Sequence, residues 1–149
     1  MKYYGFLLLF LLFTGCKTDP KNQEEEYRIP SHNTAKTMSA EDQSIARGKK
    51  VYADFCLRCH MPEGQGVPNI YPPLASTNWL TEKRKESLHA VKYGLNGEIE
   101  VNGKTYDNVM LPMGLSDREI ADVMNYVMTS FGNTQENPVT EKEVSEITE

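Results

Sequence analysis

The sequence predicts an all-α domain in which a few helices are joined by long ordered loops, with one small β-hairpin. Three observations predict this fold. Apolar residues recur at helical spacing behind capping signals at both ends of the region. Prolines and glycines crowd the segment between these ends, and an Asn-Gly pair follows a short alternating run. The predicted domain covers residues 39–132 of the 149-residue chain.

Two helices frame the predicted domain. The first is expected over residues 40–53 or slightly beyond, behind a capping box that begins at Ser39. The last follows a second capping box, which begins at Ser116, and stops at Gly132. A third helix is predicted over residues 80–93, between the other two.

The remaining residues of the domain are predicted to form loops and a hairpin. Residues 61–74 carry four prolines and are expected to be loop. Residues 98–101 alternate between polar and apolar, and the Asn102-Gly103 pair favours a type I′ turn, so a hairpin should close near Tyr106. A domain with so much loop needs another component at its centre.

Charge and hydropathy exclude two classes of protein. A formal net charge of −5 leaves no surplus of cations for phosphates, so no nucleic-acid partner is expected. The apolar run at residues 6–13 is far shorter than the roughly 20 residues that cross a bilayer, which excludes a polytopic membrane protein. Three cysteines are too few for a disulfide framework, so each needs an explanation of its own.

A C-x-x-C-H motif at residues 56–60 predicts the missing component. This motif is the attachment sequence for c-type haem. Cys56 and Cys59 lie about one helical turn apart, so both thiols can reach the two vinyl groups of one porphyrin and form thioethers. The adjacent His60 then falls under the ring, where its imidazole can coordinate the iron. The sequence therefore predicts one covalently attached haem c per chain.

The two cysteines have three other interpretations. A thioredoxin-like pair would be expected beside a βαβ pattern, which the sequence lacks. A zinc site needs about four ligands, and no second cysteine pair is present. A structural disulfide between Cys56 and Cys59 is the third alternative.

The second axial ligand of the iron decides the chemistry of the haem. Histidine with methionine raises the reduction potential and suits electron transfer, whereas an open position favours gas binding or peroxide chemistry. Met110 and Met113 are the candidates, because both lie in a proline-containing stretch just before the last helix. His89 is a less favoured alternative, and a methionine in an apolar stretch is often only core filler.

The domain resembles a class I cytochrome c of the small bacterial type. The resemblance is carried by residues 46–52, 56–60, 64–66, 71–75, 102–110 and 115–127. It implies a cytochrome c fold of three to four helices around the haem, and an electron carrier rather than an enzyme. In that family the methionine ligand lies about six residues before the Ser-Asp pair of the last helix, which implies Met110. The family usually has proline after this methionine, but Leu111 follows here, so Met113 stays an alternative.

The resemblance implies roles for four further residues. The carbonyl of Pro72, or of the neighbouring Pro73, would accept a hydrogen bond from the imidazole of His60. Trp79 would donate its indole N–H to a haem propionate, although a single tryptophan is as often simple core. Gly48 would allow a close crossing of the first and last helices.

The segments outside the domain predict export and anchoring. Residues 1–15 have the charged start, apolar stretch and small-residue stop of a signal peptide, and residues 13–16 resemble a bacterial lipobox. Lipidation of Cys16 would anchor the protein to a membrane in the cell envelope, on the periplasmic or outer-surface side. The alternative is an ordinary cleaved signal. Residues 16–38 are predicted to be a flexible tether, and residues 133–149, with five glutamates, a disordered acidic tail.

These observations predict an electron carrier that is anchored in the envelope and exchanges electrons with redox partner proteins. The first alternative is the cytochrome subunit of a larger oxidoreductase, such as a dehydrogenase, reductase or terminal oxidase. The second alternative is a haem sensor or peroxidase with an open iron position.

Overall fold

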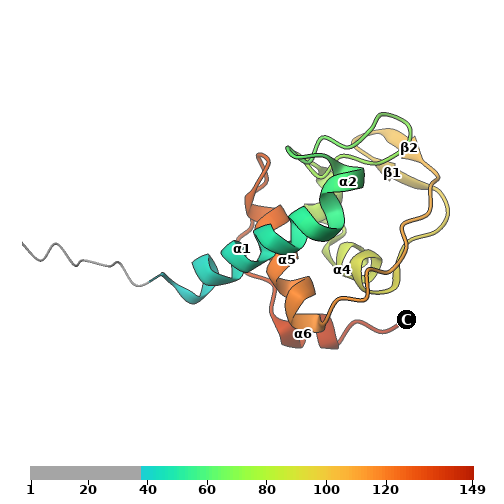
Figure 1. Ribbon diagram of the computed structural model, residues 1–149. Coiled ribbons are helices and arrows are strands. Elements are labelled where there is room, and N and C mark those ends of the chain that lie inside the picture. Colours follow the sequence, from blue (N-terminus) through green and yellow to red (C-terminus); the bar gives the residue numbers. More distant parts are fainter. Residues whose placement is uncertain (1–37) are drawn as a thin grey trace, which may run out of the picture. The chain divides into compact units, whose positions relative to one another are not determined.

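The computed structural model describes residues 38–149, and the predicted signal peptide, Cys16 and residues 16–37 of the predicted tether lie outside them. Figure 1 shows the order of the elements. They are α1 (Ala40–Val51), η1 (Tyr52–Cys56), α2 (Leu57–His60), α3 (Asn78–Glu82), α4 (Arg84–Tyr93), β1 (Ile99–Val101), β2 (Lys104–Tyr106), α5 (Asp117–Thr129) and α6 (Glu141–Ser145). The described residues are thus mostly helical with one small hairpin, which confirms the predicted fold class. None of the helices in residues 38–149 is long and apolar enough to span a membrane.

The first helix is longer than predicted, because α1, η1 and α2 follow one another without a break from residue 40 to His60. It begins with the expected capping box, in which Ser39 accepts a hydrogen bond from the Asp42 N–H. η1 is a single π-helical turn, which changes the face that the following residues present. The C-x-x-C-H motif therefore lies at the end of this continuous helix.

α1 and α5 cross at Gly48, as the resemblance implies. A Cβ atom added to Gly48 would overlap the carbonyl of Asp122 and lie 2.9 Å from the Cβ of Tyr126. One turn along α1, the ring of Tyr52 packs against that of Tyr126, with 5.5 Å between the ring centroids. Glycine is required because only a residue without a side chain allows the two backbones to approach this closely.

A partly buried ion pair also joins these two helices. The guanidinium of Arg47 donates to both carboxylate oxygens of Asp122 at 2.6 and 2.7 Å, and the Ser44 hydroxyl donates to the same carboxylate at 2.6 Å. Burial by itself would raise the pKa of Asp122, but these hydrogen bonds and the charge of Arg47 outweigh it and hold the pKa below its usual value. The carboxylate therefore stays ionised and paired at neutral pH.

The third predicted helix is wrong in one respect, because the chain forms two helices there. Lys83 separates α3 from α4, and its φ of −126° and ψ of 47° are not helical. Thr77 caps α3 by accepting from the Trp79 N–H at 3.2 Å. No proline or glycine marks Lys83, so the local sequence carries no signal for this break. The predicted end of the helix at Gly94, with φ of 88°, is confirmed.

The predicted hairpin is confirmed. β1 and β2 are antiparallel, with Val101 opposite Lys104. Asn102 and Gly103 have φ values of 50° and 72°, as a type I′ turn requires. The turn is fixed to the start of α3, since the Asn102 N–H donates to the Asn78 side chain at 2.9 Å and the Asn78 N–H donates to the Asn102 side chain at 3.0 Å.

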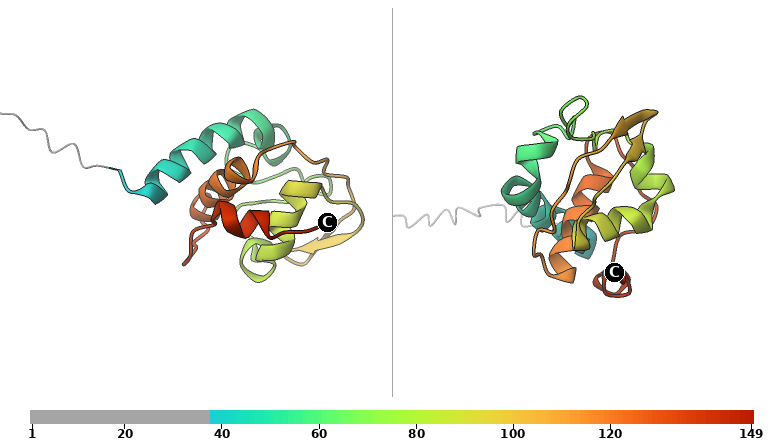
Figure 2. Two further views of the ribbon diagram at one scale, coloured as in Figure 1. Left: turned by 90° about the horizontal axis from the view of Figure 1, so that it is seen from below. Right: turned by 90° about the vertical axis from the view of Figure 1, so that its right-hand side faces the viewer.

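The predicted disordered tail is wrong. Residues 133–149, here called the C-terminal strap, contain α6 and fold back beside α5 (Figure 2). Val139, Val144 and Ile147 are no more than 5% exposed and belong to the hydrophobic core. These three apolar residues are spread among glutamates with no regular period, so the composition favours disorder although the fold has a place for each of them.

Asn125 of α5 holds the first half of the strap. Its side-chain amide donates to the Val139 carbonyl at 2.9 Å, and its carbonyl oxygen accepts from the Val139 N–H at 2.6 Å. Both backbone groups of Val139 are thereby paired in a buried position.

The Asn125→Ala substitution is therefore expected to destabilise the protein. It leaves the buried N–H and carbonyl of Val139 without partners, which should lower the free energy of unfolding by about 2 kcal/mol or more. Chemical denaturation of the holoprotein measures this loss. Asn137→Ala, at an exposed position of the same strap, is the control and should leave the stability nearly unchanged. Equal stabilities for the two variants would contradict the role of Asn125.

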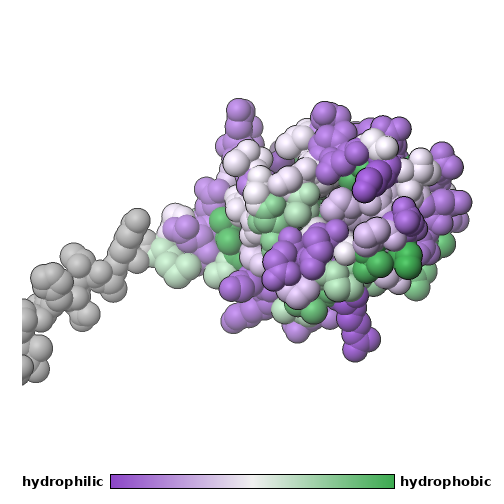
Figure 3. All heavy atoms as spheres, turned by 90° about the horizontal axis from the view of Figure 1, so that it is seen from above, coloured by the Kyte–Doolittle hydropathy of each residue, from purple (hydrophilic) through white to green (hydrophobic). Residues whose placement is uncertain are grey.

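The surface of the described residues is mixed. Figure 3 shows hydrophilic residues over much of one face, with smaller hydrophobic areas between them. Among residues 38–149, the large hydrophobic side chains that are exposed are Met38, Phe55, Leu57, Ile70, Val109 and Leu111.

Candidate functional site

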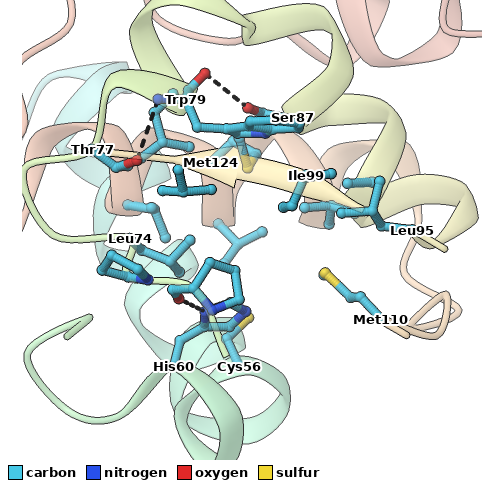
Figure 4. A pocket seen from close by; sticks show the side chains of 18 residues that line it. Cys56, His60, Leu74, Thr77, Trp79, Ser87, Leu95, Ile99, Met110 and Met124 are labelled. Atoms are coloured by element: carbon cyan, nitrogen blue, oxygen red, sulfur yellow. Dashed lines mark hydrogen bonds between the residues drawn. The ribbon is translucent and has the colours of Figure 1, made fainter. Parts of the chain in front are cut away.

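The end of the first helix opens onto an apolar cleft. Its inner cavity is lined by Cys56 and His60 and by apolar side chains from the long loops, α3, α4, the hairpin and α5 (Figure 4). Its outer cavity is lined by Cys59 and by residues of the loop after α2, of the hairpin and of the loops on either side of the hairpin. Five residues line both cavities, which therefore form one cleft: His60, Pro72, Leu95, Ile99 and Met110.

His60 is buried and held in one orientation. Its Nδ1 atom lies 3.0 Å from the carbonyl oxygen of Pro72, as the dashed line in Figure 4 shows. This is the hydrogen bond that the resemblance implies, and it is made by Pro72 rather than Pro73. Burial lowers the pKa of His60 and outweighs the opposing effect of the Pro72 carbonyl. The ring is therefore neutral, with Nδ1–H donating and Nε2 left as a free electron-pair donor.

The two cysteines of the motif open onto the same cleft. Cys56 lines the inner cavity and Cys59 the outer one, and they are not joined by a disulfide. Burial, together with the neighbouring Cys59, raises the pKa of the Cys56 thiol to about 11. Thioredoxin-like pairs work through a thiol of lowered pKa, so this environment argues against that alternative. Residues 38–149 contain no group of three His, Cys, Asp or Glu side chains that could hold a metal ion.

Met110 is held at the opposite wall from His60. Its N–H and carbonyl bond to the backbone of Leu95 at 2.9 and 2.8 Å. Figure 4 shows the sulfur of Met110 pointing into the cleft across from His60. Met113 lines only the outer cavity, and His89 packs against Tyr93 without lining either cavity.

Trp79 forms part of the inner wall. Its ring lines the inner cavity, and its backbone carbonyl accepts from the Ser87 hydroxyl at 3.4 Å. The ammonium of Lys83 lies 4.7 Å from the ring centroid. The position of Trp79 on this wall is compatible both with a contact to a bound group and with a role in the hydrophobic core.

Gly94 and Leu95 are functional positions that the sequence interpretation missed. A Cβ atom on Gly94 would lie 2.6 Å from the carbonyl oxygen of Met110, so glycine is required for the pairing of Leu95 with Met110. The sequence context of Gly94 marks the end of a helix. Nothing in that context indicates that Leu95 pairs with Met110, because these two residues lie on either side of the hairpin.

Comparison with known proteins identifies the family to which the chain belongs. The family model described as cytochrome c matches residues 45–131. The chain belongs to the cytochrome c family. It is an electron carrier rather than an enzyme, and it binds covalently attached haem c, as members of this family do.

Individual relatives are of two kinds. Cytochrome c-552 of Thermus thermophilus is 38% identical over 111 residues, which cover 68% of this chain and 84% of that protein. The cytochrome c subunit of alcohol dehydrogenase (quinone) from Gluconacetobacter polyoxogenes is 29% identical over 119 residues, 77% of this chain and 25% of that longer protein. The fructose dehydrogenase cytochrome subunit of Gluconobacter japonicus is 28% identical over 125 residues, 76% of this chain and 25% of that protein.

The donor set of this cytochrome c fits the haem. A neutral imidazole and a thioether face each other across the cleft (Figure 4), and the thiols of Cys56 and Cys59 line the same cleft. Imidazole and thioether are the axial ligands of electron-transfer haems, and the two thiols supply the covalent attachment. The apolar walls between them suit the flat face of a porphyrin, because they keep water away from it.

Proposed function

We propose that the chain is a single-haem electron carrier in which His60 and Met110 are the axial ligands and Cys56 and Cys59 form the thioethers. The position of Met110 carries this proposal. Of the two candidate methionines, it alone lines both cavities and faces His60, whereas Met113 lines the outer cavity only. The same position argues against the sensor or peroxidase alternative, because the methionine would fill the position that such proteins leave open.

The residues of the cleft support the carrier function in three ways. Haem c, when bound, supplies an iron that takes up and releases one electron without breaking a bond. The Pro72 carbonyl fixes the ring of His60, and the Leu95 pairing fixes the backbone of Met110, so the two ligands keep their positions in both oxidation states. The apolar lining excludes water. The outer cavity, with its exposed Ile70, Val109 and Leu111, would leave one haem edge near the surface for the redox partners.

The mass and spectrum of the mature protein test the cofactor assignment. We expect one covalently bound haem per chain, which survives denaturation, and a visible spectrum that changes on reduction. A mass equal to that of the bare peptide would contradict both the thioethers at Cys56 and Cys59 and the site built on them.

The cell envelope is the proposed location, with a lipid on Cys16 as the anchor. The lipobox-like residues 13–16 behind an apolar run support this proposal. Residues 16–38 would then act as a tether that keeps the domain near the membrane.

Replacing Cys16 by alanine is expected to release the protein from the membrane, because the acyl chains supply the anchoring free energy. Fractionation of cells into membrane and soluble parts measures the change. Cys16 is the residue to alter because Cys56 and Cys59 are required for the haem. Unchanged sedimentation of the Cys16→Ala protein with membranes would refute the lipid anchor.

A second candidate function is supported by the dehydrogenase cytochrome subunits among the relatives. In that case the chain would accept electrons from a catalytic subunit within a stable complex. Affinity purification of the full chain from detergent-solubilised membranes separates the two functions. Recovery of a stoichiometric dehydrogenase would favour the subunit role, and recovery of the cytochrome alone would favour the carrier.

A further inference from the structure

Lys92, near the end of α4, lies where three separate segments of the chain meet. Its ammonium donates to the carbonyl of Val144 at 2.8 Å and to the carbonyl of Ile147 at 3.3 Å, both in the C-terminal strap. It also lies 3.1 Å from the carboxylate of Asp117, the first residue of α5. The three donors of one ammonium thus match three acceptors, and the side chain is only 16% exposed.

These contacts border the methionine segment, which is residues 107–116 between β2 and α5 and carries Met110. Met110 itself is paired with Leu95, which follows Lys92 by three residues and lies just beyond the end of α4. The segment ends at the start of α5, where Asp117 lies. Lys92 therefore links the end of α4, from which Leu95 holds Met110, to the start of α5, where the methionine segment ends.

The strap strengthens this link. The hydroxyl of Tyr93 donates to the carbonyl of Ile147 at 3.0 Å, next to the contact that Lys92 makes with the same oxygen. Val144 and Ile147 are 0% and 5% exposed, so the strap is anchored by burial on this side. The strap begins beyond residues 45–131 that match the family model, so the acceptors that it offers to Lys92 and Tyr93 lie outside the matched region.

We propose that Lys92 is a positioning residue for Met110, because it joins the end of α4, the start of α5 and the C-terminal strap and thereby holds the methionine segment against the cleft. This inference rests on the proposed function, in which Met110 is an axial ligand. A loosened segment would let the sulfur leave the iron more often while the haem stays attached through its thioethers.

The binding of imidazole to the ferric protein measures how often the sixth position is open. Imidazole binds only molecules in which the methionine has left, so its apparent affinity is proportional to the population of that state, and Lys92→Met should tighten binding roughly tenfold. Methionine keeps the length and apolar stem of the lysine but removes the ammonium. The titration is followed by absorption at neutral pH. Separate denaturation curves in the same buffer show that each holoprotein variant is folded under these conditions.

Two control variants separate positioning from general stability. Lys85→Met makes the same change at an exposed position of α4 and should leave imidazole affinity at the wild-type value. Arg47→Met destabilises the α1–α5 crossing through Asp122, away from Lys92, and should also leave the affinity unchanged. Equal tightening by Arg47→Met, or wild-type affinity for Lys92→Met, would overturn the proposal.

Asp117→Ala is the second test, which remains available if Lys92→Met does not fold. It removes one of the three acceptors, at a half-exposed position, and should tighten imidazole binding by a smaller factor. In the double variant the affinity should equal that of Lys92→Met alone, because both changes break the same link. If the effects of the two substitutions on imidazole affinity were additive, the proposed link between Lys92 and Asp117 would be refuted.

The failure of this inference can be distinguished from failure of the proposed function. If Met110 is not a ligand, Met110→Ala will leave imidazole affinity unchanged. If Met110→Ala tightens binding strongly while Lys92→Met and Asp117→Ala do not, the ligand assignment stands and the positioning role of Lys92 is refuted.

Discussion

Met110→Ala is expected to abolish the weak long-wavelength absorption band of the ferric protein that reports a bond between iron and methionine sulfur. It should also lower the reduction potential by on the order of 0.1–0.3 V, within the roughly 0.8 V range over which axial ligands set haem potentials. The physical reason is that methionine sulfur raises the potential relative to water or another nitrogen ligand. The haem should stay attached, because the thioethers at Cys56 and Cys59 are not altered.

Met113→Ala is the matched control, since Met113 lies in the same segment but lines only the outer cavity. It should keep the long-wavelength band and shift the potential little. Redox titration followed by absorption measures both quantities in one experiment. Loss of the band in Met113→Ala, with its retention in Met110→Ala, would exchange the two assignments.

Gly48→Ala is expected to lower the free energy of unfolding strongly, although it adds only one methyl group to α1. Alanine by itself would favour the helix by about 1 kcal/mol relative to glycine. The added Cβ, however, would overlap the carbonyl of Asp122, which is backbone and cannot move aside without separating α1 from α5. Overpacking of this kind costs about 3 kcal/mol or more, a large fraction of the 5–15 kcal/mol that stabilises a typical domain.

Chemical denaturation of the holoprotein measures this loss, with Lys50→Ala as the control. Lys50 is exposed on the same helix, so its replacement should change the free energy of unfolding by no more than about 0.5 kcal/mol. A Gly48→Ala protein as stable as the wild type would show that the two helices do not need this close approach.

The elements that the sequence predicted well are those whose signals are local. The capping boxes at Ser39 and Ser116 and the turn at Asn102-Gly103 appear in the structure as predicted. Each depends on side chains that reach only a few residues along the chain, so the sequence context suffices. The break between α3 and α4 at Lys83 was not predicted, because no proline or glycine marks it in the local sequence.

The residues of the candidate site also fall into two groups, those that the sequence predicted and those that only the structure shows. The resemblance identified Pro72 as the acceptor for His60, and the structure contains that hydrogen bond. The resemblance implied Met110 and kept Met113 as an alternative, and in the structure Met110 lines both cavities of the cleft whereas Met113 lines only the outer one. The link made by Lys92 could not be predicted, because its acceptors lie in α5 and in the strap, far away along the chain.

The sequence by itself determined the cofactor class, because the two thiols and the imidazole that hold a haem must lie within one or two helical turns and therefore within five residues. Only the tertiary structure decided which methionine faces the histidine and whether the last residues are ordered. Both depend on burial against surfaces that exist only after the helices have packed, and three apolar side chains among glutamates become a strap only where the fold leaves room for them.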